Sequence, residues 1–150
     1  MPNNYIAAFG LTCLLATAGG ARATPAGKSS YRVVYSFLGG TDGFNPYASL
    51  VKVGGTLYGT TTQGGTQRFG TVFAVNAATG AHNVLHSFKG GTDGLAAYAG
   101  LIKVGGSLYG ATTQGGSVRI DAGTVFSVKP KSGAEHIVHA FREGSDGGHP

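Results

Sequence analysis

The chain has 150 residues, of which 41% are hydrophobic, and this is enough for one domain with a packed core. Only 11% of the residues are charged, so the surface must consist largely of Gly, Thr, Ser, Asn and Gln, a composition common outside cells. The formal net charge of +5 comes from cations that are spread along the chain. This spacing argues against a nucleic-acid partner, and a weak attraction to anionic cell-envelope polymers is the simpler hypothesis.

The first 23 residues are predicted to be a signal peptide. A mostly apolar run from Tyr5 to Ala18 precedes Ala-Arg-Ala at positions 21–23, a small-x-small pattern typical of export-signal cleavage sites. The run is shorter than the roughly 20 apolar residues that span a bilayer, so we expect no transmembrane segment in the mature chain. The protein is therefore predicted to be secreted, in an extracellular, periplasmic or cell-envelope location. A helix at the N-terminus of the folded domain is the alternative.

Two observations complete the N-terminal region. Cys13 is the only cysteine and lies inside the apolar run, so a cleaved chain would contain neither a thiol nor a disulfide. Lipidation of Cys13 is a further alternative. Residues 24–30 are polar and contain Pro25 and Gly27, which is typical of a linker between signal and domain.

The rest of the chain is a tandem repeat. The string from Phe37 to Gly65 returns almost unchanged from Phe88 to Gly116, 51 residues further on, and a third copy begins at Phe141. Such a period is typical of solenoid units or propeller blades. The repeat region, 31–150, is predicted to contain a closing-type strand over 31–37, a unit over 38–88, a second unit over 89–141 and a truncated third unit over 142–150.

Each unit is predicted to contain four strands and no helix. Residues 31–37 alternate with a period of two, as the end of each later unit does. The Gly-Gly pair at 54–55 separates two short strands, which indicates a tight hairpin because such turns need positive φ. Residues 70–75 and 81–88 then read as a second hairpin around a five-residue turn.

A four-stranded antiparallel unit of this length has the size of one β-propeller blade. Residues 31–37 correspond to the fourth strand of a unit whose first three strands are missing, which is the role of a closing strand. Propellers need about four to eight blades, whereas this chain supplies two full units. We therefore predict an all-β array of propeller-like blades that is an incomplete ring or a fragment, completed by further blades of the same chain or by other protomers.

The chain contains four short motifs: Gly-Thr-Val-Phe at 70–73, Leu-His-Ser-Phe at 85–88, Thr-Asp-Gly at 41–43 followed by Pro46, and Leu-Tyr-Gly-Thr-Thr at 57–61. They return with changes in the later copies, where Ala97 replaces Pro46, Ala111 replaces Thr60, and 138–141 reads Val-His-Ala-Phe. In this combination the chain from residue 31 onward resembles the GloVer-type, or choice-of-anchor, family of secreted bacterial tandem-repeat proteins. The resemblance implies a propeller-like domain on an exported protein, and it supplies no catalytic residues.

An aspartate followed by glycine occupies the same position in all three copies. A turn is needed in every unit, whereas an active site is normally built once, and Asp-Gly is typical of turns. Calcium would need six to eight oxygen ligands, and the chain has only six acidic residues. We therefore expect structural turns at these positions, and no metal or cofactor; they are Asp42, Gly43, Asp93, Gly94, Asp146 and Gly147.

The histidines also follow the repeat. His86 and His139 are equivalent, and Tyr35 stands at the same position in the first copy, so we expect an aromatic ring that packs and forms a hydrogen bond. His136 and His139 lie three apart on a predicted strand and so point to opposite faces. This spacing does not predict a metal site.

Function is expected where the copies differ, because the shared residues are explained by the scaffold. The loop between the two hairpins is the least similar part of the units, and length changes inside repeats usually fall in surface loops that carry binding. The candidate ligand-binding residues are Phe44, Asn45, Arg68, Phe69, Arg119 and Asp121.

We predict a binding or surface-display scaffold, whose partners would be extracellular glycans or cell-envelope polymers. The alternative is part of a secreted carbohydrate-active enzyme, a hydrolase or lyase, whose catalytic blades are absent from this chain. The sequence contains no G-x-S-x-G elbow and no adjacent pair of carboxylates. No catalytic residue is assigned, and a non-enzymatic role is favoured.

Overall fold

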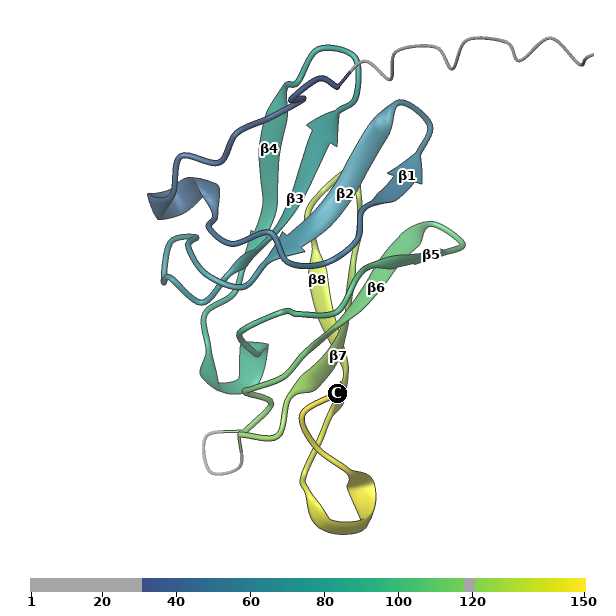
Figure 1. Ribbon diagram of the computed structural model, residues 1–150. Coiled ribbons are helices and arrows are strands. Elements are labelled where there is room, and N and C mark those ends of the chain that lie inside the picture. The colour runs from purple at the N-terminus through teal and green to yellow at the C-terminus, as the bar shows by residue number, and fades with distance from the viewer. Residues whose placement is uncertain (1–30, 118–120) are drawn as a thin grey trace, which may run out of the picture. The chain divides into compact units, whose positions relative to one another are not determined.

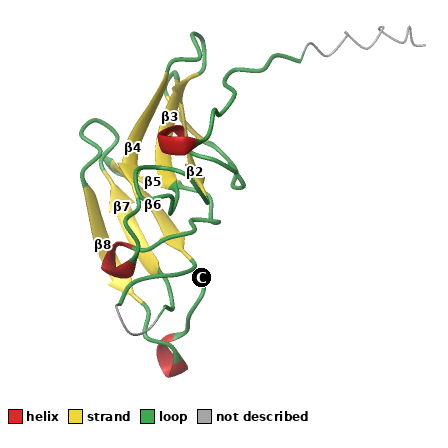
Figure 2. Ribbon diagram, turned by 90° about the vertical axis from the view of Figure 1, so that its left-hand side faces the viewer, coloured by secondary structure: helices red, strands yellow, loops and turns green. Residues whose placement is uncertain are grey.

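The computed structural model describes residues 31–117 and 121–150. The predicted signal peptide and linker lie outside the described residues. The described part contains eight strands in two four-stranded antiparallel sheets and no α-helix (Figures 1 and 2). Among these residues no helix is long and apolar enough to cross a membrane.

The first sheet consists of four strands in the order of the chain, and each is antiparallel to the next. The tight hairpin between the first two strands turns at Gly54, whose φ is 59°. The strands are β1 (Val51–Val53), β2 (Thr56–Thr61), β3 (Thr71–Asn76) and β4 (His82–Ser87).

The second sheet repeats this arrangement. Its strands are β5 (Ile102–Val104), β6 (Ser107–Thr112), β7 (Thr124–Val128) and β8 (Glu135–Ala140). A shift in register is repeated as well. In the last strand pair it falls between Val72 and Phe73 in one sheet and between Val125 and Phe126 in the other. The prediction of all-β units with four antiparallel strands is confirmed. The two sheets form no closed ring.

The predicted strand over 31–37 is not formed, because this segment pairs with no other strand in the part of the chain that is described. It is held by its side chains instead. Phe37 packs edge-on against Phe73 of β3, with ring centroids 4.9 Å apart. Phe88, the equivalent residue at the end of β4, packs in the same way against Phe126 of β7, at 5.1 Å. Residues 31–37 therefore pack on the first sheet in the same way as the end of the first unit packs on the second sheet.

The described residues contain no α-helix, but they contain short 3-10 turns that the sequence did not predict. Each copy of the Asp turn forms a single 3-10 turn: η1 (Gly40–Asp42), η2 (Gly91–Asp93) and η3 (Gly144–Asp146) (Figure 2). The residue before each turn has a positive φ, as does the glycine after it. The tight turn therefore needs residues that tolerate this conformation on both sides.

The core lies where the two units meet. Phe88 and Phe126 are fully buried, with Leu108 and Val128 packed in the same cluster. Fully burying one such side chain stabilises the fold by about 1.5–3 kcal/mol. The contact of these two phenylalanines thus fastens the end of the first unit to the second sheet.

Candidate functional site

The aspartate of each turn binds two groups that precede it in the chain. Asp42 accepts hydrogen bonds from the backbone N–H of Leu38, at 2.8 Å, and from the Tyr35 hydroxyl, at 2.7 Å. The same pair of bonds recurs in the other copies, at Asp93 with Lys89 and His86, and at Asp146 with Arg142 and His139. The ring expected to pack and form a hydrogen bond at this position thus does so in all three copies.

The glycine after each aspartate lies against a pair of threonines. Gly43 has φ 105°, and a Cβ there would lie 2.9 Å from Thr61 Cγ2 and 3.0 Å from Thr71 Oγ1. The two threonine hydroxyls form a hydrogen bond of 2.8 Å. Gly94 lies in the same way on Thr112 and Thr124. The Asp-Gly string therefore closes the turn over the sheet, and only glycine fits there.

A third side chain joins the first of these turns. His82 Nδ1 lies 3.0 Å from Asp42 Oδ1, and its ring stacks on Tyr35. The hydrogen bond to Asp42, with burial and the aspartate charge, raises the pKa of Tyr35 to about 12. Burial opposes ionisation of Asp42, but the bonds from Leu38 and Tyr35 and the charge of His82 outweigh it and lower the pKa.

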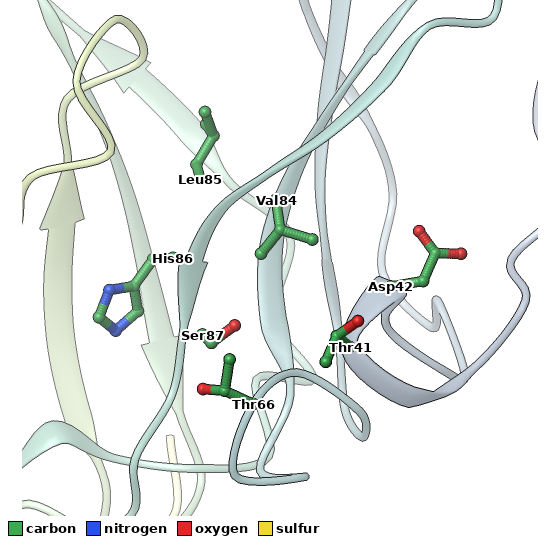
Figure 3. Close-up of a pocket in the computed structure, with 7 residues that line it drawn as sticks. All are labelled: Thr41, Asp42, Thr66, Val84, Leu85, His86 and Ser87. Atoms are coloured by element: carbon green, nitrogen blue, oxygen red, sulfur yellow. The ribbon is translucent and has the colours of Figure 1, made fainter.

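A hollow of about 480 Å³ lies beside this turn. Figure 3 shows Asp42 and His86 on opposite sides of it, directed away from each other, with hydroxyl groups between them. The arrangement offers no acid and base that converge on one point, so it gives no support for catalysis in this hollow. Its lining residues are Thr41, Asp42, Thr66, Val84, Leu85, His86 and Ser87.

Two further hollows, of about 330 and 470 Å³, share Gln63 and are called here the Gln63 groove. Phe44 and Gln63 are joined through their backbones, with N···O distances of 2.8 and 3.2 Å, and this bridge holds the two residues side by side. The first hollow is lined by Gly39, Gly40, Phe44, Gln63, Gly64 and Arg68, and the second by Asn45, Pro46, Tyr47, Thr62, Gln63 and Tyr98.

The Gln63 groove is rich in exposed aromatic rings. Tyr47 is 77% exposed, Phe44 50% and Tyr98 48%. Tyr47 and Tyr98 are equivalent residues of the two units, and their rings meet edge to face with centroids 5.6 Å apart. Aromatic rings are large contact surfaces with few rotatable bonds, so an exposed pair of this kind is well suited to hold a ligand.

The structure brings three of the six candidate ligand residues together in this groove: Phe44, Asn45 and Arg68. Phe69 lies elsewhere, with its ring against Gly90 and its carbonyl oxygen accepting the N–H of Ala96. Asp121 accepts the backbone N–H of Gly115. Arg119 lies outside the described residues.

The backbone φ angles of Asn45 and Arg68 show which of these conformations belongs to the repeat and which occurs in the variable loop. Asn45 has φ 56°, but the equivalent Ala96 and His149 have φ 57° and 54°, so this conformation belongs to the repeat. Arg68 also has a positive φ, 67°, in the loop that differs between the units. No carboxylate of the described residues forms an ion pair with Arg68, which leaves its charge available to a ligand.

Sequence reasoning missed Tyr47, Tyr98 and Gln63. Tyr47 and Tyr98 occupy one repeat position and Gln63 recurs as Gln114, so neither position shows the difference between units that predicted the other candidates. One signal could have found the tyrosines: each stands in the loop that follows the Asp-Gly turn, outside the predicted strands, where a large aromatic residue has no core to fill.

Comparisons with known proteins place the chain in a repeat family. The comparison with curated proteins gave no match, and neither did the comparison with solved structures. The model of the Gloeobacter/Verrucomicrobia repeat matches residues 19–150, which is most of the chain and includes every described residue. The chain therefore belongs to the Gloeobacter/Verrucomicrobia repeat family.

Proposed function

We propose that this chain is a binding module of an exported repeat protein and that its Gln63 groove holds a glycan that carries carboxylate groups. The observation that carries the proposal is the exposed pair Tyr47 and Tyr98 in one hollow of the groove and Arg68 in the other, with Gln63 lining both hollows. The apolar faces of sugar rings stack on aromatic rings, and sugar hydroxyls exchange hydrogen bonds with an amide. A guanidinium binds a carboxylate with two parallel hydrogen bonds.

The position of the tyrosines favours an extended ligand. They are equivalent residues of consecutive units, so a polymer of sugars that lies across both units meets a similar ring in each. The net charge of +5 supports an anionic polymer, because it attracts such a chain at long range. Cell-envelope and extracellular polysaccharides that contain uronic acids have this chemistry.

The proposal includes the architecture: the two sheets are blades of a β-propeller-like array. The support is the packing of 31–37 on the first sheet, where Phe37 and Tyr35 make the contacts that Phe88 and His86 make at the junction between the sheets. This packing is expected of a segment that takes the place of the last strand of a preceding blade. Further blades, from this chain or other protomers, would complete the ring.

Binding to a panel of neutral and uronic-acid oligosaccharides, measured by calorimetry, tests the function. We expect an acidic oligosaccharide to bind, and Tyr47→Ala and Tyr98→Ala each to weaken it by about tenfold, which is about 1.4 kcal/mol. Arg68→Gln should weaken the acidic ligand and reduce the dependence of binding on salt. Tyr31→Ala is the matched control, because Tyr31 is an exposed aromatic residue outside the groove.

Two outcomes would contradict the proposal. The first is binding that the groove variants and the Tyr31 control reduce equally. The second is the release of shorter sugars from the bound polymer, which would favour the enzyme alternative over a binding module.

A further inference from the structure

One cluster of metal-ligating side chains lies where the two sheets meet. It consists of His86 on β4, Asp93 in η2 and Glu135 on β8, and within the described residues it is the one group of three such side chains close enough to hold an ion. Their ligand atoms all lie within 4.8 Å of one another, and His86 Nε2 is 3.2 Å from Asp93 Oδ2. We propose that these three residues bind one zinc ion.

The distances and ligand types suit zinc. Zinc bonds to histidine nitrogen and carboxylate oxygen are about 2.0–2.2 Å long, which places neighbouring ligands of a tetrahedral site about 3.4 Å apart. His86 Nε2 and Asp93 Oδ2, which are 3.2 Å apart, are already near that separation. An imidazole with two carboxylates favours zinc over magnesium or calcium, which prefer oxygen ligands alone. Three protein ligands leave the fourth position to water.

A second observation points to a ligand at this place. Glu135 Oε1 is shielded from solvent and has no hydrogen-bond partner among the described residues. Two carboxylates as close as those of Asp93 and Glu135 repel each other when both are ionised. A cation between them would offset this repulsion and give the shielded oxygen a partner.

The repeat supplies its own comparison. Residues 31–37 pack on the first sheet, and the positions equivalent to the cluster there are Tyr35, Asp42 and His82. In that copy the Tyr35 hydroxyl donates a hydrogen bond to Asp42. His139 and Asp146 are the equivalents in the third copy, and no third ligand joins them in the described chain. The cluster is therefore specific to the junction between the two sheets. Because its ligands come from both sheets, bound zinc would fasten one to the other.

The test uses the full chain, freed of metal by a chelator and titrated with zinc chloride by calorimetry. We expect one zinc ion per chain and a higher melting temperature in zinc. Glu135→Gln and His86→Gln should each lower the zinc affinity by more than about a hundredfold, beyond what loss of an outer-shell partner usually costs. His139→Gln is the matched control, since it changes the same residue type in the copy that lacks the third ligand.

A measurement on the unmutated chain tests the proposal even if a variant fails to fold. Zinc should protect His86 from modification by diethyl pyrocarbonate, mapped by mass spectrometry, and should leave His139 reactive. Three results would overturn the proposal: no saturable zinc binding, equal loss of affinity in the His139 control, or equal protection of both histidines.

Discussion

Asp42 and its equivalents form hydrogen bonds with neighbours that the repeat supplies. Each carboxylate binds the backbone N–H four residues earlier and an aromatic ring seven residues earlier. The side chain therefore pins the chain on both sides of the 3-10 turn. This use of the carboxylate explains why an aspartate recurs in every copy.

The lowered pKa of Asp42 predicts how stability changes in acid. Its pKa in the unfolded chain is about 3.8 and that in the folded chain is lower, so its bonds stabilise the fold above pH 3.8 and are lost as the pH falls through the folded value. We expect Asp42→Asn to be less stable than the parent chain near neutral pH, with the difference shrinking in acid. Urea denaturation at several pH values measures this, and a difference that does not change with pH would contradict it.

Gly43 gives a prediction from backbone geometry. Gly43→Ala places a side chain at φ 105° and against Thr61 and Thr71, so we expect a loss of about 2 kcal/mol or more of unfolding free energy. Gly55→Ala is the control, because its φ is ordinary and a Cβ there meets nothing within 4 Å. Urea denaturation of the two variants compares them. Equal losses would show that the turn does not need glycine.

At the scale of elements, the contact between the end of β4 and β7 joins the two sheets. Phe88→Ala removes a fully buried ring that packs on Phe126, and such truncations cost about 3–5 kcal/mol. Phe44→Ala is the comparison, because Phe44 is half exposed. We expect the Phe88 variant to lose much more stability by urea denaturation. Similar losses would place the main core elsewhere.

The strands could be predicted from the sequence because their apolar alternation and glycine turns are local signals. Residues 31–37 have the same alternation, but a strand also needs a partner edge, which lies outside any local pattern. The 3-10 turns depend on bonds from Asp42 to Leu38 and Tyr35, and the short Gly-Thr-Asp string gives no helical period.

The candidate site was predicted only in part for a similar reason. Phe44 and Asn45 differ from their counterparts Leu95 and Ala96, and Arg68 lies in the loop whose length differs between the units, so the differences between the units predicted all three. Tyr47 and Tyr98 form a pair across 51 residues, and only the folded chain shows that they meet. The cluster of His86, Asp93 and Glu135 was missed because its ligands come from three separate elements.

At the scale of the whole described molecule, repetition separates two tasks. The residues that recur in every copy build turns, strands and the packed junction between the sheets. The groove combines recurring tyrosines with a loop that differs between the units, and the cluster at the junction arises where Glu135 stands in place of His82. A regular scaffold thus carries local departures that provide the proposed binding chemistry.

The most direct test of the binding proposal is an NMR titration of the isotopically labelled chain with oligogalacturonate, an acidic oligosaccharide. We expect the backbone amide signals of Phe44, Gln63 and Tyr98 to shift in a saturable way, and the signals around Asp146 to remain in place. Shifts that are absent, or that spread evenly over the chain, would contradict the assignment of the groove as the glycan site.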